Sequence, residues 1–344
     1  MKLEIDLIEA NLHAPFVWGS GSVSVRELLL VRLEGADGQV GLGEAAALEP
    51  YDGVSTADVR AALEDCRGLL AGSDGEPAGE LLGACAAVAV LPQAVAALDL
   101  ALWDLAGRRA NEPVWRLLGS AAPPAIEVNG TISAPDRAGA ARDAAAARAA
   151  GFGCVKVKVG LGDDAGRLAA VRAVAGVEMA IRLDANGAWS VPEAASTLRV
   201  LQPVGIELCE EPVSGLAAIR ELSTLTTIPI AIDETAAHPG ALDQRACDLA
   251  CLKIARCGGI SGVIEAARRA RTAGYEVYLA STLDGPIGIA AALHAAAAIR
   301  PDRRCGLATL GVFAGRVDVL PASQGRIPVP TGPGLGEALR FWYE

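Results

Sequence analysis

Hydrophobic and polar residues follow two different patterns along this chain. In its first third, apolar and polar positions alternate with a period of two over segments 3–12, 26–35 and 39–46, as they do in strands that bury one face. Segments 58–70 and 92–107 instead have the period of helices. This part of the chain therefore predicts three antiparallel strands followed by helices, which together make an α+β domain.

From residue 126 onward, short apolar runs alternate regularly with alanine-rich segments of helical period. A strand, a loop, a helix and a second loop take about 20–30 residues, and the apolar runs recur at that spacing. Strands are predicted at 126–131, 154–159, 180–185, 206–210, 229–233, 249–254, 276–281 and 304–308. Eight parallel strands with intervening helices favour a closed barrel over an open doubly wound sheet.

The predicted fold class is α/β, with a TIM-like (β/α)8-type barrel and an N-terminal α+β capping domain. We expect the capping domain over residues 1–120 and the catalytic barrel over 121–318. The remaining segment, 319–344, is expected to pack back on the capping domain. A chain of 344 residues suits a barrel of about 200–250 residues plus a smaller domain.

Composition narrows the functional classes. A formal net charge of −11 argues against binding nucleic acid or an anionic membrane through bulk charge. The chain does not start like a signal peptide, and Pro92, Gln93 and Asp99 interrupt its most membrane-like stretch, 81–103. The eight cysteines include no CxxC pair and are expected to be reduced and buried. We therefore expect a cytoplasmic protein that binds neither nucleic acid nor a membrane.

Charged residues close five successive predicted strands. Lys158, Asp184, Glu210, Asp233 and Lys253 each end an apolar run, and they are separated by 26, 26, 23 and 20 residues. Because the strands are parallel, these side chains are expected to meet at the C-terminal end of the barrel. That end is where barrel enzymes have their active sites.

The three acids among them predict a metal site. Carboxylates that converge without a histidine repel each other unless a hard divalent cation lies among them. Such ligands favour Mg²⁺, with Mn²⁺ as the alternative. The expected ligands are Asp184, Glu210 and Asp233. Three polar residues that follow them by one or two positions are candidates for supporting the ligands or the substrate: Asn186, Glu211 and Glu234.

The lysines predict proton transfer. Lys156 and Lys158 lie two positions apart and so point to the same side of one strand, while Lys253 comes from the other side of the predicted metal site. A lysine beside the cation is expected to have a lowered pKa and to act as a base. The α-proton of a carboxylate is very weakly acidic, because its loss creates a dianion, and a Mg²⁺ with an ammonium beside it would offset that charge. The expected substrate is therefore a small carboxylate.

Other catalytic arrangements are absent from the sequence. None of the three histidines, His13, His238 and His294, ends a predicted barrel strand, and there is no HExxH, P-loop or serine-elbow motif. A Schiff-base aldolase would need a single isolated lysine without the acid triad.

Several motifs resemble those of the enolase superfamily, in its muconate-lactonizing-enzyme subgroup. They are AALDLALWDLAGRRANEPVWRLLG (96–119), KVKVG (156–160), RLDANGAW (182–189), CEEP (209–212), IDE (232–234) and LKIARCGGI (252–260). The resemblance covers nearly the whole chain. It implies a (β/α)7β barrel, the same three Mg²⁺ ligands, Lys158 as base supported by Lys156, and Lys253 as the second lysine, and a lysine base with Mg²⁺ is a known pattern of this superfamily. CEEP departs from the family's Glu-Gln-Pro, since Glu211 replaces the usual glutamine.

The resemblance also bears on the reaction. The mandelate-racemase subgroup has a histidine after the seventh strand, where this chain reads LASTLDGP (279–286). STLDGPIGIAAALHAAA (281–297) followed by CGLAT (305–309) is similar to o-succinylbenzoate synthases, and the Asp-x-Asp that dipeptide epimerases usually carry at the eighth strand is missing. We therefore expect a lyase that dehydrates its substrate through an enediolate, as o-succinylbenzoate synthase does. Two alternatives stay open: a dipeptide or N-acylamino acid epimerase or racemase, and a muconate-type cycloisomerase.

Substrate choice is expected to come from loops of the first domain that cover the barrel mouth, as the resemblance implies. The candidate loops are 15–23 and 47–54, with Trp18 and Tyr51 as candidate substrate contacts. Ser281 and Asp284, which follow the seventh strand, are further candidates. We expect the protein to be a homo-oligomer.

Overall fold

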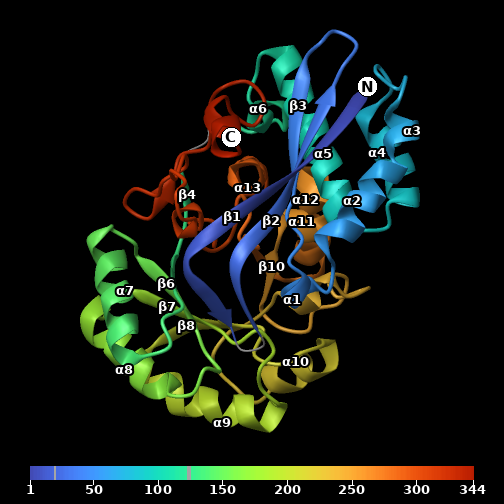
Figure 1. Cartoon of the computed structure of the whole chain (residues 1–344). Coiled ribbons are helices and arrows are strands. Elements are labelled where there is room, and N and C mark those ends of the chain that lie inside the picture. Colours follow the sequence, from blue (N-terminus) through green and yellow to red (C-terminus); the bar gives the residue numbers. More distant parts are fainter. Residues whose placement is uncertain (19–20, 122–124) are drawn as a thin grey trace.

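The computed structural model describes residues 1–18, 21–121 and 125–344, and it contains a capping unit and a barrel (Figure 1). The capping unit is built on an antiparallel sheet of three strands in the order β1 (Lys2–Trp18), β2 (Gly21–Glu34) and β3 (Val40–Ala45). Its helices are α1 (Glu49–Asp52), α2 (Thr56–Asp65), α3 (Arg67–Leu70), α4 (Ala78–Val88), α5 (Pro92–Ala110) and α6 (Val114–Leu117). The predicted α+β unit is thus confirmed.

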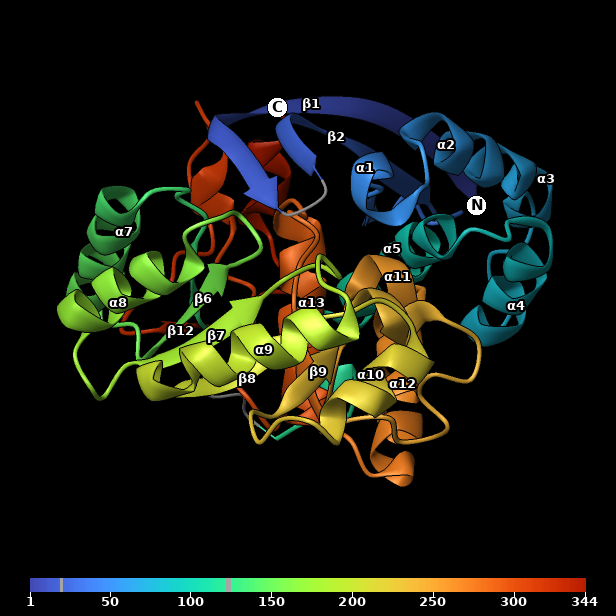
Figure 2. The same cartoon turned by 90° about the horizontal axis from the view of Figure 1, so that it is seen from below.

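Strands β1 and β2 form a ribbon that extends well beyond β3 and curves over the barrel (Figure 2). Its pairing runs from Lys2 and Glu34 to Trp18 and Gly21, with a register shift between Asn11 and Phe16. The prediction of a loop at 15–23 is therefore wrong for the described part of that segment, which is strand. Gly19 and Ser20 lie outside the described residues.

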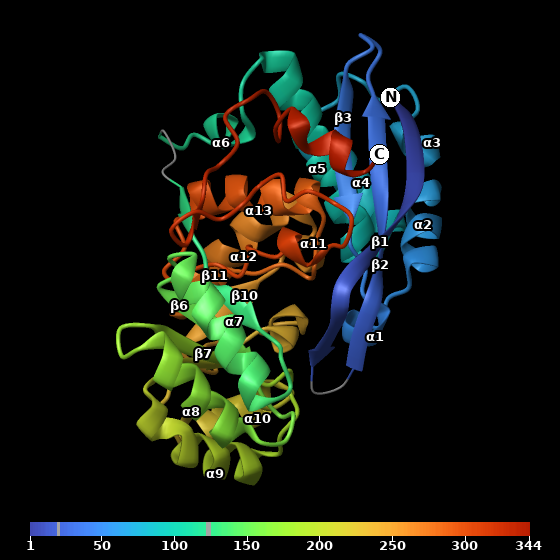
Figure 3. The same cartoon turned by 60° about the vertical axis from the view of Figure 1, so that its left-hand side comes forward.

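Helix α5 joins the two units. It packs against β3 on one side and against barrel helices on the other (Figure 3). Gly41 and Gly43 make the close packing on β3 possible, because a Cβ at Gly43 would lie 1.9 Å from the carbonyl oxygen of Ala97. Toward the barrel, the indole of Trp103 donates a hydrogen bond to the hydroxyl of Ser261 at 2.9 Å. The helix predicted over 92–107 is therefore confirmed, and much of it is buried.

The barrel sheet has seven described parallel strands in the order β11-β10-β9-β8-β7-β6-β5. They are β5 (Gly130–Ile132), β6 (Cys154–Lys158), β7 (Ala180–Asp184), β8 (Ile206–Glu210), β9 (Ile230–Ile232), β10 (Leu249–Leu252) and β11 (Glu276–Leu279). The helices and helical turns that follow are α7 (Arg137–Ala149), α8 (Asp164–Ala175), α9 (Val191–Leu201), η1 (Gln202–Val204), α10 (Leu216–Ser223), η2 (Glu234–Ala237), α11 (Ile254–Cys257), α12 (Gly259–Ala273) and α13 (Pro286–Ile299). The strand–helix rhythm read from the sequence is confirmed.

Two predicted strands differ from the regular pattern. The first, 126–131, is divided into β4 (Ile126–Glu127), which pairs antiparallel with β12 (Arg326–Ile327), and β5. The eighth, 304–308, is reduced to single bridges from Cys305 to Val128 and from Gly306 to Ala280. These parallel bridges connect both edges of the sheet and close the barrel.

The C-terminal segment contacts the capping unit. Its elements are η3 (Leu310–Val312), β12 and η4 (Ala338–Trp342). The backbone NH of Leu335 donates to Asp104 Oδ1 of α5 at 2.7 Å. The hydroxyl of Tyr343, which follows η4, donates to Glu44 of β3. The division of the chain at residues 120 and 318 stays a prediction. Within the described ranges, the helices are too short or too polar to cross a bilayer.

Candidate active site

The barrel brings together at one end the five charged residues that close predicted strands. Lys158, Asp184 and Glu210 are register partners at the ends of β6, β7 and β8, and Asp233 and Lys253 directly follow β9 and β10. All five are buried, with at most 6% of any one exposed. The chain has four lysines, and three of them, counting Lys156, lie in this cluster. Ammonium groups at such depth require compensating charge.

On the β6 side, two lysines share one carboxylate. Lys156 Nζ donates to Asp184 Oδ2 at 2.8 Å and to Glu210 Oε1 at 3.0 Å. Lys158 Nζ donates to the same Asp184 oxygen at 2.7 Å and to Asn186 Oδ1 at 2.7 Å. The side chains of Lys158 and Asn186 line the cavity described below. Lys156 thus ties two acids together, and both lysines line the cavity.

On the β10 side, one lysine is held by both units of the molecule. Lys253 Nζ donates to Asp233 Oδ2 at 2.6 Å and lies 2.5 Å from the hydroxyl of Tyr51, which belongs to α1 of the capping unit. The Tyr51 hydroxyl donates to the same Asp233 oxygen at 2.8 Å. The ammonium also lies 4.3 Å from the centroid of the Tyr51 ring, which stabilises its positive charge. Tyr51, a predicted substrate contact, therefore also orients a lysine.

The acids and lysines control each other's protonation. Burial lowers the pKa of Lys253, but the charge of Asp233 outweighs it and the pKa is raised. Burial also lowers the pKa of Lys156. The charges of Asp184 and Glu210 outweigh burial, so this pKa lies well above its ordinary value. The direction for Lys253 is opposite to the lowered lysine pKa expected from the sequence, because the carboxylate of Asp233 lies 2.6 Å from its ammonium. That expectation assumed that the charge of a cation dominates the site.

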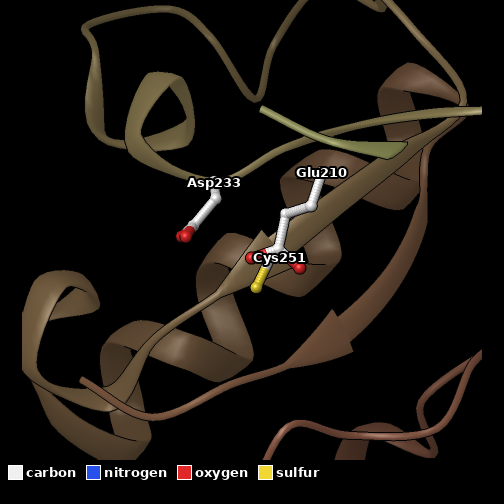
Figure 4. A group of neighbouring side chains, drawn as sticks. All are labelled: Glu210, Asp233 and Cys251. Atoms are coloured by element: carbon white, nitrogen blue, oxygen red, sulfur yellow. The ribbon is translucent and has the colours of Figure 1, made fainter. Parts of the chain in front are cut away.

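The carboxylates of this cluster fit a hard divalent cation. Asp233 Oδ1 is buried and has no hydrogen-bond partner among the described residues. Oxygen atoms of Glu210 and Asp233 lie within 4.8 Å of each other and of Cys251 Sγ (Figure 4). Asp184 adjoins this group through Lys156. An unpaired buried carboxylate oxygen among acids and no histidine is the donor chemistry that Mg²⁺ prefers.

Cys251 belongs to this group although the sequence analysis did not single it out. It lies two positions before Lys253, so both side chains are expected on the same side of the extended chain. This two-residue spacing is the feature of the sequence that could have identified Cys251. Burial, with the charges of Glu210 and Asp233, raises the pKa of its thiol well above the ordinary value. A neutral thiol is a weak ligand for a hard cation, so the carboxylates remain the candidate ligands.

The three predicted supporting residues do not form one group. Asn186 and Glu234 are hydrogen-bonded to each other, whereas Glu211 accepts backbone NH groups that follow β9. Asn186 bridges Lys158 to Glu234, whose Oε1 accepts from Asn186 Nδ2 at 2.9 Å. The carboxylate of Glu211 accepts the backbone NH groups of Asp233 at 2.6 Å and of Thr235 at 3.1 Å. Burial and the charge of Glu234 raise the pKa of Glu211 to about 8. Asn186 and Glu211 both have positive φ, +46° and +37°, so these contacts stabilise strained backbone at the site.

A cavity opens onto the lysines. Of the predicted contacts, Trp18, Tyr51 and Ser281 line it, whereas Asp284 does not. Asp284 is instead 1% exposed and accepts a hydrogen bond from the hydroxyl of Thr282 at 2.7 Å, so a role for it in supporting the site or contacting substrate stays a prediction. The other lining residues outside the charged cluster are Phe16, Leu48, Thr131, Thr282, Leu283, Gly306 and Thr309. Asp184 is the one acidic side chain in this described lining.

Two family models cover the chain almost from end to end. Residues 2–119 match the N-terminal domain of mandelate racemase / muconate lactonizing enzyme, and residues 121–342 match the enolase C-terminal domain-like family. The chain belongs to the muconate-lactonizing subgroup of the enolase superfamily. It is therefore an enzyme whose chemistry starts by removing a proton α to a carboxylate.

Relatives within this superfamily catalyse different reactions. An L-Ala-D/L-Glu epimerase from Clostridium acetobutylicum is 31% identical over 85% of both chains. An o-succinylbenzoate synthase from Mycobacterium bovis is 39% identical, but over 55% of this chain and 59% of its own. Membership of the superfamily therefore leaves the overall reaction to be argued from the site.

Solved structures of relatives have the same fold over nearly the whole chain. A dipeptide epimerase from Cytophaga hutchinsonii, complexed with Mg and the dipeptide D-Ala-L-Val, has a TM-score of 0.90 at 28% identity, covering 98% of this chain and 97% of its own. The N-succinyl Arg/Lys racemase from Bacillus cereus has a TM-score of 0.91 at 27% identity, covering 98% and 95%.

Proposed function

We propose that this enzyme inverts the configuration at the carbon α to the carboxylate of an amino-acid derivative whose amine is acylated. The observation that carries the proposal is the pair of buried lysines in one cavity. Lys158 ends β6 and Lys253 follows β10, so β7, β8 and β9 separate them around the barrel. A base on each side of one carbon is the arrangement that inversion needs.

Asp184, Glu210 and Asp233 would hold Mg²⁺. The ion would bind the substrate carboxylate, offset the charge that develops there when the proton leaves, and draw the charge of the acids away from the lysines. Lys158 takes the α-proton of one enantiomer, and Lys253 delivers a proton to the other face. In the reverse direction the two lysines exchange roles.

Other residues of the chain position these groups. Lys156 fixes oxygens of Asp184 and Glu210, so the acids keep their mutual orientation without substrate. Tyr51 fixes Lys253 against Asp233. Phe16, Leu48 and other apolar side chains of the lining exclude water from the carbanion-like species, which slows its protonation by solvent.

The lining supports an acylated rather than a free amine. A substrate ammonium group buried in this cavity would need an anionic partner. Asp184 is the one acid in the described lining, and both lysines on its side already share its Oδ2. The eighth-strand side of the cavity presents Gly306 and Thr309, which are neutral. An amide nitrogen fits these surroundings without an unpaired charge.

The relatives favour inversion over the dehydration that we expected first. Epimerases and the N-succinyl amino acid racemase match this chain over most or nearly all of its length. Dehydration of the o-succinylbenzoate-synthase type remains the second candidate. It is favoured by the higher identity over a shorter segment, 39% over 199 residues, and by the same neutral eighth-strand side.

The test is a panel assayed with Mg²⁺ in D₂O. It contains N-succinyl and N-acetyl amino acids, dipeptides with a free amino group, and the hydroxycyclohexadiene acid that dehydrates to o-succinylbenzoate. Mass spectrometry reports deuterium at the α-carbon, chiral chromatography reports inversion, and ultraviolet absorption reports the aromatic product.

We expect exchange and inversion of N-acylated amino acids. Inversion of free-amine dipeptides alone would contradict the substrate assignment. Aromatic product without inversion of any amino-acid derivative would replace the proposed reaction by dehydration. Omitting Mg²⁺ and adding EDTA is the control, and it should abolish both activities.

A further inference from the structure

A buried arginine outside the catalytic cluster connects two walls of the cavity. Arg26 lies on β2 of the capping unit and is 2% exposed. Its Nε donates to the carbonyl oxygen of Leu283, in the loop after β11, at 3.3 Å. Its Nη1 donates to the carbonyl oxygen of Ala47, which precedes Leu48 and α1. Leu283 and Leu48 both line the cavity.

The Leu283 backbone is in a conformation that its side chain disfavours. Its φ is +58°, in the left-handed region that glycine occupies freely and a leucine rarely does. Leu283 is nevertheless 5% exposed and lines the cavity. Strained backbone persists when its surroundings hold it, and the guanidinium of Arg26 is a direct contact that does so.

Glu44 of β3 fastens Gly285, two residues further along the same loop. Its Oε1 accepts the backbone NH of Gly285 at 2.8 Å, and its Oε2 accepts the hydroxyl of Tyr343. A Cβ at Gly285 would lie 2.3 Å from Glu44 Oε2, so the loop approaches β3 as closely as glycine permits. The loop that carries Ser281, Thr282 and Leu283 is thus attached to the capping sheet, not only to the barrel.

We propose that Arg26 is a positioning residue for substrate specificity. Its forked side chain fixes Leu283 on the barrel side and the Ala47–Leu48 segment on the capping side, and so sets the width of the cavity between them. It touches neither lysine nor any of the three acids in the described structure, so it acts on substrate fit rather than on proton transfer. The part of this proposal that concerns the substrate rests on the proposed function.

The structural part is tested without substrate. Arg26→Met keeps the apolar stem and removes both hydrogen bonds. Hydrogen–deuterium exchange of the purified protein should become faster in peptides that cover 279–288 and 44–54. The matched control is Arg32→Met on the same strand, where Arg32 pairs with Asp6 on the half-exposed surface. Unchanged exchange in both segments of Arg26→Met would overturn the proposal.

The functional part uses the best N-acylated amino acid of the panel. In Arg26→Met, KM should rise about 5- to 10-fold while kcat stays within about twofold, because uniform binding is lost and the chemistry is not. In a Leu283→Gly background, the same change should raise KM less, since glycine needs no brace. A fall in kcat with unchanged KM, or equal effects in both backgrounds, would overturn it.

If Arg26→Met does not fold, Arg26→Lys takes its place in both experiments. Arg26→Lys keeps the charge but lacks the fork that reaches two carbonyls, and it should loosen at least one of the two segments. If no compound in the panel turns over in the wild type, the proposed function fails, and the hydrogen–deuterium exchange comparison still decides whether Arg26 braces the loop.

Discussion

Two of the three lysines that line the cavity, Lys158 and Lys253, are held in different ways. Lys158 has its partners, Asp184 and Asn186, on one barrel strand and the loop that follows it. Lys253 has one partner in the barrel, Asp233, and one in the capping unit, Tyr51. The hydrogen bonds of the first base therefore come from the barrel, and its contact with the capping unit is the ring of Phe16, whose centroid lies 5.7 Å from its ammonium. The hydrogen bonds of the second base are completed only when the capping unit is docked. Movement of the capping unit would change proton transfer on one face of the substrate more than on the other.

The largest expected effect comes from removing either lysine. Lys158→Ala and Lys253→Ala should each slow inversion by about 10²–10⁴-fold, because inversion needs both bases and each acts by general acid–base catalysis. Chiral chromatography of a pure enantiomer measures the rate. The control is Lys2→Ala, the one lysine outside the cluster, whose side chain is 65% exposed. If either variant inverted its substrate at the wild-type rate, the lysine that it lacks would not be a required base, and the two-base mechanism would be wrong.

The anchor of Lys253 is also a candidate metal ligand. Asp233→Asn should weaken Mg²⁺ binding by more than the about 10–100-fold that loss of an outer partner costs. Calorimetric titration with Mg²⁺ measures this. Asp243→Asn is the control, since Asp243 is an exposed partner of Arg269. Unchanged affinity in Asp233→Asn would show that the ion, if bound, lies elsewhere.

A smaller change should separate the two lysines. Tyr51→Phe removes the hydroxyl beside Lys253 and keeps the ring, so proton transfer on that face should slow by about 10-fold, as for loss of a hydrogen bond to a charged group. Transfer at Lys158 should stay near the wild-type rate. Deuterium incorporation from each enantiomer reports the two faces separately. Equal slowing on both faces would mean that Tyr51 acts on the whole cavity.

The last effect, on stability rather than on rate, concerns the joint between the two units. Burial and the charge of Asp284 raise the pKa of Glu44 from 4.5 to about 8. Between these values the folded protein holds a proton that the unfolded chain releases, so stability is full below pH 4.5 and falls as pH rises toward 8. The slope is at most about 1.4 kcal/mol per pH unit.

Thermal unfolding across this pH range measures that slope. Glu44→Gln should flatten it while keeping an acceptor for the NH of Gly285. A profile that is as steep in Glu44→Gln as in the wild type would assign the slope to other groups. A flat profile in the wild type would contradict a buried, neutral Glu44 at this joint.

The barrel could be predicted from the sequence because its chemistry repeats along the chain. Lys158, Asp184 and Glu210 end strands that are hydrogen-bonded neighbours, so a spacing of one strand–helix unit translates directly into proximity. The first strand was read as continuous, yet it divides because Ile126 and Glu127 pair with a strand 199 residues away. Local pattern does not encode such a partner.

The capping side of the site could not be predicted in the same way. Tyr51 meets Asp233 across 182 residues, and Arg26 meets Leu283 across 257. These contacts depend on how two units dock, and no periodicity along the chain reports that. The left-handed Leu283 was also hidden, since leucine gives no signal of a positive φ. Asp284 does not line the cavity, because a polar residue beside a cavity can point away from it.

The stereochemistry of exchange in the two lysine variants tests the central claim most directly. Each pure enantiomer of the preferred N-acylated amino acid is incubated with Mg²⁺ in D₂O, and deuterium at the α-carbon is measured for both variants. We predict that Lys158→Ala retains exchange with one enantiomer and Lys253→Ala with the other. Exchange of the same enantiomer by both variants, or of both enantiomers by either one, would contradict two bases on opposite faces of a single carbon.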